Sequence, residues 1–103
     1  MAAPQRLDGI YAVVPTLTES GFPVIANNWR LVMAPKGLTA AQTAFWDDVF
    51  KRLTTSEEWN KELQSRYLSN NYLNSDETRK YLAQHYDEIK QILTEIGLAK
   101  QPN

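Results

Sequence analysis

The chain has 103 residues, of which 43% are apolar, and this length suits one small domain with a modest core. Its 11 basic and 12 acidic side chains nearly cancel, which argues against nucleic acid as the main partner, because phosphate binding needs a basic excess on one face. The absence of cysteine excludes disulfides, thiolate metal sites and cysteine nucleophiles.

The first residues lack the apolar core of a secretory signal, and no stretch approaches the ~20 apolar residues of a membrane span. Expressed without a signal peptide, this chain is therefore expected to stay in the cytoplasm. Prolines and glycines interrupt residues 1–23, which predicts irregular structure. Within that region residues 10–14 form a candidate strand that stops at Pro15, and residues 15–21 fit one helical turn that ends at Gly21.

The segment 24–34 is a second candidate strand, ended by Pro35-Lys36-Gly37. Its residues 31–34 are apolar at successive positions, which is typical of a strand buried on both faces of a helix-covered sheet. Such a strand needs neighbours on its edges, and the chain offers at most one other candidate. The predicted sheet is therefore larger than this sequence can build.

The first two predicted helices carry clear start signals. Thr39 and Gln42 have the spacing of a capping box, and the second helix is expected to start at Thr55 or Ser56. Each helix has an apolar face: Phe45, Trp46, Val49, Phe50 and Leu53 in the first, and Trp59, Leu63 and Tyr67 in the second.

The third predicted helix begins near Ser75 and keeps an apolar spacing of three and four over about 20 residues. Gly97 is placed to adopt the left-handed conformation of a Schellman ending, with Leu98 as its apolar contact. Residues 100–103 are predicted to be a polar tail.

No catalytic or metal-ligating set is predicted. His85 is the only histidine and has no partner at a suitable spacing, so a structural role is expected. The acidic pairs Asp47-Asp48, Glu57-Glu58 and Asp87-Glu88 are adjacent in sequence and diverge around their helices, which is typical of a solvated face. The isolated glycines form no phosphate-binding loop, and no cofactor is predicted.

Asn27, Asn28, Trp29 and Arg30 place polar groups at the start of an otherwise apolar strand. Strand alternation puts Asn28 and Arg30 on one face and Trp29 on the other. Such a cluster either braces a domain junction or faces a ligand, where the Arg30 guanidinium could hold a carboxylate. Bracing is favoured, because ligand contacts usually come from loops after strands.

Short motifs follow one another along the chain: Arg6-Leu-Asp-Gly9, Val14-Pro-Thr-Leu-Thr-Glu-Ser-Gly21, Asn28-Trp-Arg30 and Ala34-Pro-Lys-Gly37. In this order, and together with two helix starts (Thr39–Gln42 and Ser56–Trp59) and the last helix ending (Ile96–Leu98), the series resembles the closing region of the solute-binding receptors of the tripartite tricarboxylate transporter (Bug) family. The resemblance covers roughly residues 6–99. Leu31 departs from it, because the family usually has glycine after the arginine.

The resemblance implies an α/β chain, mostly helical, that forms the C-terminal part of a type II periplasmic-binding-protein fold. One or two strands and three helices are expected. Residues 1–23 would be the tail of the second lobe and the approach to the hinge, and residues 24–99 would complete the first lobe. Asn28, Trp29 and Arg30 are then hinge candidates, and no ligand-binding residue is carried over, because the family's ligand contacts come mainly from earlier loops.

The full receptors of this family are periplasmic, are not enzymes, and pass a small organic acid to transporter subunits in the membrane. They are much longer than this chain and begin with a secretory signal, so the chain is expected to be a receptor fragment. One alternative is a stand-alone helical protein-interaction module without ligand-binding activity. A trihelical DNA-binding domain over residues 39–97 is disfavoured, because its helices carry no basic recognition face.

Overall fold

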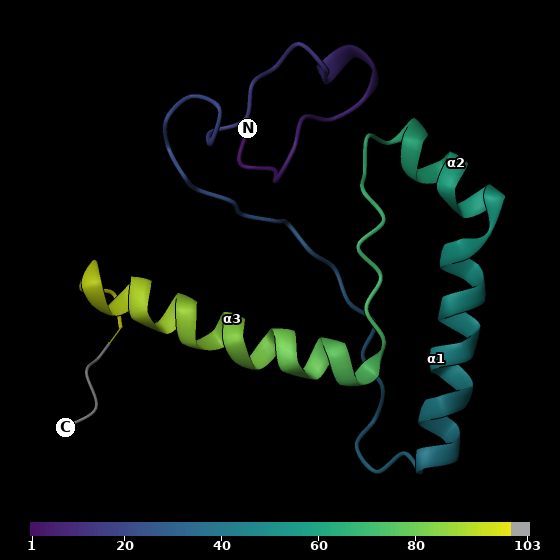
Figure 1. The fold of residues 1–103 in the computed structure, drawn as a ribbon. Coiled ribbons are helices and arrows are strands. Elements are labelled where there is room, and N and C mark those ends of the chain that lie inside the picture. The colour runs from purple at the N-terminus through teal and green to yellow at the C-terminus, as the bar shows by residue number, and fades with distance from the viewer. Residues whose placement is uncertain (100–103) are drawn as a thin grey trace. The chain divides into compact units, whose positions relative to one another are not determined.

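The computed structural model describes residues 1–99 and is mostly helical, as predicted. Figure 1 shows the short 3-10 helix η1 (Gly9–Tyr11) followed by α1 (Ala40–Thr55), α2 (Glu57–Ser65) and α3 (Ser75–Glu95). The predicted polar tail, residues 100–103, lies outside the described residues.

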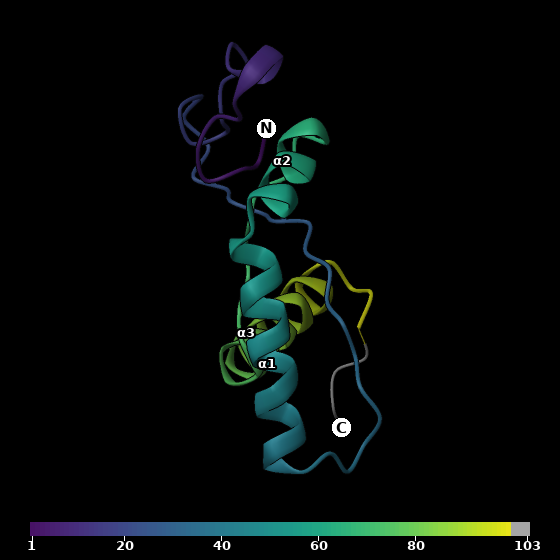
Figure 2. The same ribbon diagram turned by 90° about the vertical axis from the view of Figure 1, so that its right-hand side faces the viewer.

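Neither predicted strand forms, since residues 1–99 contain no strand. Residues 10–14 instead enter η1 and a turn, in which the Ala12 N–H donates to Gly9 O (3.2 Å) and the Val14 N–H to Tyr11 O (3.0 Å). Residues 24–34 have no regular secondary structure, and they run as plain coil in both views (Figures 1 and 2). A strand is stable only when a second strand completes its ladder, and no described segment supplies one.

The chain divides into two compact units. The first unit comprises Met1–Leu38 and Thr54–Asn71, and the second comprises Thr39–Leu53 and the chain from Tyr72 onward. The predicted boundary between residues 23 and 24 concerns the lobes of a whole receptor and stays a prediction.

In the first unit, α2 begins where the sequence indicates. The Ser56 side chain accepts a hydrogen bond from the Trp59 N–H (3.2 Å), and Glu57 and Glu58 lie at the positive end of the helix dipole. Leu63 is 9% exposed and is the only buried apolar residue among residues 1–99. Tyr67 lies beyond the end of α2 instead of on its apolar stripe.

In the second unit, α1 begins with the predicted capping box. The Thr39 N–H donates to Gln42 Oε1 (2.9 Å), and the Gln42 N–H donates to Thr39 Oγ1 (3.2 Å). The Trp46 ring lies 5.4 Å from Phe45 and 6.0 Å from Phe50 between centroids. This aromatic cluster is only partly covered, because Phe45 is 61% exposed.

The third helix is defined at both ends. A capping box at its start joins Asn74 and Glu77, through backbone-to-side-chain bonds of 2.9 and 3.1 Å. At its end the Leu98 N–H donates to Leu93 O (2.8 Å) and the Gly97 N–H to Thr94 O (3.1 Å). With Gly97 at φ +76°, these two bonds confirm the predicted Schellman ending.

Replacing Gly97 by alanine is expected to weaken this ending by roughly 1 kcal/mol, since a Cβ disfavours the left-handed conformation. The cost is purely conformational, because a Cβ at Gly97 would meet nothing within 4 Å. Faster hydrogen exchange of the Leu98 amide would report the loss. Gly97→Asn is the matched control, because asparagine tolerates positive φ better than alanine. An equal effect of both substitutions would contradict this account.

Candidate functional site

The three hinge candidates lie in the irregular segment before α1. Asn28 and Arg30 are exposed, and Trp29 is half-buried. The ion pairs among residues 1–99 do not include Arg30. The assignment of these side chains to a hinge stays a prediction.

A compact polar cluster forms instead around the Glu19 carboxylate, in the motif that precedes Gly21. The Thr16 N–H donates to Glu19 Oε2 (2.9 Å), and the Glu19 N–H donates to Thr16 Oγ1 (3.1 Å). This reciprocal pair is a capping box at the start of the predicted helical turn. The turn itself is confirmed, because the Ser20 N–H donates to Thr16 O (3.1 Å). Thr16 is only 3% exposed.

Arg6 completes the Glu19 cluster from thirteen residues away in the chain. Its Nε donates to Glu19 Oε1 (3.1 Å) and Oε2 (2.8 Å), and its Nη1 donates to Ala12 O (3.2 Å). The hydrogen bond from the Thr16 backbone, followed by that from Arg6, holds the pKa of the Glu19 carboxyl below its usual range. The carboxylate oxygens are thus occupied by donors of the chain itself, which indicates a structural clasp instead of a ligand site.

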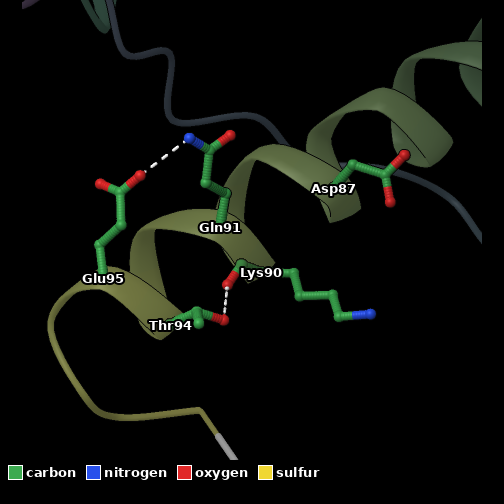
Figure 3. A pocket seen from close by; sticks show the side chains of 5 residues that line it. All are labelled: Asp87, Lys90, Gln91, Thr94 and Glu95. Carbon is green, nitrogen blue, oxygen red and sulfur yellow. Dashed lines mark hydrogen bonds between the residues drawn. The ribbon is translucent and has the colours of Figure 1, made fainter. Parts of the chain in front are cut away.

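The second unit contains an open polar hollow on α3, lined by Asp87, Lys90, Gln91, Thr94 and Glu95. Figure 3 shows that these side chains come from one face of one helix, with Gln91 Nε2 donating to Glu95 Oε1 (2.8 Å) and Thr94 Oγ1 donating to Lys90 O (2.7 Å). Binding sites for small solutes enclose most of the ligand. Because this hollow has a single wall, it does not qualify as one.

Also in the second unit, Asp47 joins α1 to the start of α3. Its carboxylate accepts the Ser75 N–H (2.9 Å) and the Ser75 hydroxyl (2.6 Å), and its backbone carbonyl accepts the Tyr72 hydroxyl (3.1 Å). Partial burial, followed by the negative charges of Asp47 and Glu77, raises the pKa of the Tyr72 hydroxyl. The prediction of a solvated face holds for Asp48, which is exposed, but is wrong for Asp47, which is half-buried.

His85 stacks on Tyr81, with ring centroids 5.5 Å apart, and its Nδ1 lies 3.8 Å from a Glu88 carboxylate oxygen. Within residues 1–99 no group of three or more His, Asp or Glu side chains is placed to hold a metal ion. The structural role expected for His85 stays a prediction.

Comparison of the chain with models of protein families, with curated proteins and with solved structures finds no match. The family resemblance of the motif series therefore stays a prediction. None of the helices in the described part of the chain is long and apolar enough to cross a membrane.

Proposed function

We propose that this chain is the C-terminal part of a periplasmic solute-binding receptor of the tripartite tricarboxylate transporter type. In the whole receptor it would help to deliver small carboxylates or related solutes to the membrane subunits of the transporter. It would act without catalysis and without a cofactor. The observation that carries this proposal is the lack of cover over the apolar faces of α1 and α3.

The apolar stripe of α3 illustrates this lack of cover. Ile89, Ile92 and Ile96 recur at helical spacing, yet they are 41, 50 and 60% exposed. Large exposed apolar patches mark surfaces that bind other protein parts. Both ends of α3 are capped, by the Asn74–Glu77 box and by the Gly97 ending. The helix is therefore stabilised locally, but its apolar face has no packing partner among residues 1–99 that covers it. This combination supports the interpretation of the chain as part of a larger fold.

The segment 24–34 supports the same conclusion. Val32 and Met33 are 74 and 83% exposed, although they point to opposite faces if the segment is extended. Neighbouring strands and covering helices from the rest of a receptor would bury both faces and satisfy the backbone. In the proposed receptor this segment becomes a strand of the first lobe, and Asn28, Trp29 and Arg30 lie where the chain crosses from the second lobe.

The DNA upstream of the coding region provides a direct test. A receptor-like coding sequence there, in frame or separated by a frameshift, would support the proposal. Its absence would remove the support that the motif series gives to the fragment interpretation.

The isolated chain is expected to bind no small dicarboxylate with useful affinity, because the other half of the proposed cleft is absent from it. Calorimetric titration with a panel of dicarboxylates should give only heats of dilution. Saturable binding with a Kd in the micromolar range would contradict the expectation. Buffer titrated with the same ligands is the control.

A stand-alone interaction module is the second candidate function, and the same exposed stripe would then receive a partner protein. The N-terminal caps of α1, α2 and α3 favour this alternative, because the start of each helix is stabilised locally. The two candidates differ in how the purified chain should unfold, since an independent module needs a cooperative core of its own.

A further inference from the structure

A continuous line of contacts in the first unit leads from Glu19 to the end of α2. Arg6 holds the Glu19 carboxylate with its Nε and the Ala12 carbonyl with its Nη1. Ala12 is the residue that ends η1. Within η1, the Tyr11 ring packs edge-on against the Tyr67 ring, with centroids 4.9 Å apart and planes at 89°. The guanidinium thus connects a carboxylate to the element that lies on Tyr67.

The backbone at Tyr67 provides an independent observation. Tyr67 has φ +54° and is the only residue other than glycine at positive φ among the described residues. It occupies the left-handed position after α2, since the Tyr67 N–H donates to Gln64 O (3.1 Å) and the Leu68 N–H to Leu63 O (2.9 Å). Glycine is the usual residue there, and a bulky aromatic residue is strained.

A residue with a strained backbone persists where the surrounding structure fixes its conformation, and such residues often lie at functional sites. The Tyr67 ring contacts the residues of η1. A Cβ built on Gly9 would lie 3.4 Å from Tyr67 Cε1, so the backbone of η1 passes close to the ring. The ring contacts with Gly9 and Tyr11 give a reason for tyrosine at a position that favours glycine.

We propose that η1 is a strap that closes over Tyr67 at the end of α2, and that the ionised Glu19 carboxylate, acting through Arg6, keeps it closed. Loss of the negative charge frees the guanidinium, which releases Ala12 and with it the Tyr11 ring. This device depends on residues of one compact unit and stands whether or not the chain is a receptor fragment.

The charged groups that act on Glu19 are the Arg6 guanidinium and the Met1 ammonium. Glu19 contributes the carboxyl group of this cluster, so protonation of Glu19 in acid removes the negative charge that Arg6 binds. Because its pKa is lowered in the folded chain, the strap gains stability above the ordinary carboxyl range. That stability is lost as the pH falls through the lowered pKa, so the strap opens in acid.

Photo-oxidative cross-linking of neighbouring tyrosines in the full 103-residue chain tests this proposal. Peptide mapping by mass spectrometry would measure the dityrosine link between Tyr11 and Tyr67 at pH 7. Glu19→Gln should reduce this link several-fold, because it removes the charge and keeps the shape. Arg6→Lys should do the same, because an ammonium cannot hold the carboxylate and the Ala12 carbonyl as a planar fork does.

Asp8→Asn is the matched control, since Asp8 precedes η1 and makes no side-chain capping bond; it should leave the link unchanged. Helical content by far-UV circular dichroism should be the same in all variants. Retention of the Tyr11–Tyr67 link in both Glu19→Gln and Arg6→Lys would overturn the proposal. An equal loss in Asp8→Asn, or loss of the link together with the helices, would also overturn it, because the effect would then not be specific to Glu19.

Discussion

The purified chain is expected to bind anilinonaphthalene sulfonate strongly and to lose its helical circular dichroism gradually on heating, without a single cooperative transition. The physical reason is the scarcity of buried apolar surface, since Leu63 alone is buried among the apolar residues of positions 1–99. Cooperative unfolding requires a core that links the elements, and dye binding reports apolar surface that remains open to water.

A variant pair can locate the surface that binds the dye. Ile96→Glu places a charge on the α3 stripe, where Ile96 is 60% exposed, and should lower the dye fluorescence while the helical signal remains. Lys90→Glu changes the charge on the polar face of the same helix and should leave the fluorescence nearly unchanged.

A sharp thermal transition that coincides by several probes, together with dispersed amide resonances, would contradict the expected behaviour. It would favour the stand-alone interaction module, because the chain would then form a cooperative core by itself.

Asp47→Ala is expected to destabilise the start of α3 by about 1 to 3 kcal/mol, since it removes the acceptor of two hydrogen bonds at a half-buried position. The Ser75 N–H is one of the first donors of α3, and the Asp47 carboxylate is its partner. The hydrogen-exchange rate of the Ser75 amide, measured on the millisecond scale, should increase by roughly 5- to 150-fold.

Asp48→Ala is the matched control, because Asp48 is the adjacent carboxylate on the same helix. Its ion pair with Arg52 (2.8 Å) joins side chains that are 54 and 80% exposed, and such pairs contribute little. The effect should stay within about 0.5 kcal/mol, and the Ser75 amide should be unaffected. Equal acceleration of Ser75 exchange in both variants would contradict the assigned role of Asp47.

The helix boundaries could be predicted from the sequence because they depend on neighbours within one or two turns. The Thr39–Gln42 box, the Ser56 cap and the Gly97 ending each involve residues a few positions apart, and the structure has all three. The same rule applied to Asn74 and Glu77 would have fixed the start of α3 as well.

The strands could not be predicted in this way, because a strand depends on partners far along the chain. The apolar run at 31–34 indicates burial on both faces, but it cannot say whether anything is present to bury it. In residues 1–99 no strand pairs with the segment, so a pattern suited to a sheet remains without regular structure.

Only one part of the Glu19 cluster could be predicted from the sequence. Thr16 and Glu19 have the spacing of a capping box, the same signal that located the start of α1. Arg6 could not be assigned to Glu19, because their contact depends on the path of the intervening loop. Asp47 was missed for the same reason, since its partner Ser75 lies 28 residues away.

The near absence of buried apolar surface also governs how the chain responds to cooling. A packed domain of about 100 residues has a heat capacity of unfolding of about 1.2 to 1.5 kcal/mol/K, which comes from exposing apolar surface to water. With Leu63 as its one buried apolar side chain in the described residues, this chain should have a far smaller value. Its stability curve is then nearly straight instead of dome-shaped, and its helices should gain population steadily towards 0 °C, as isolated peptide helices do, with no cold-induced loss.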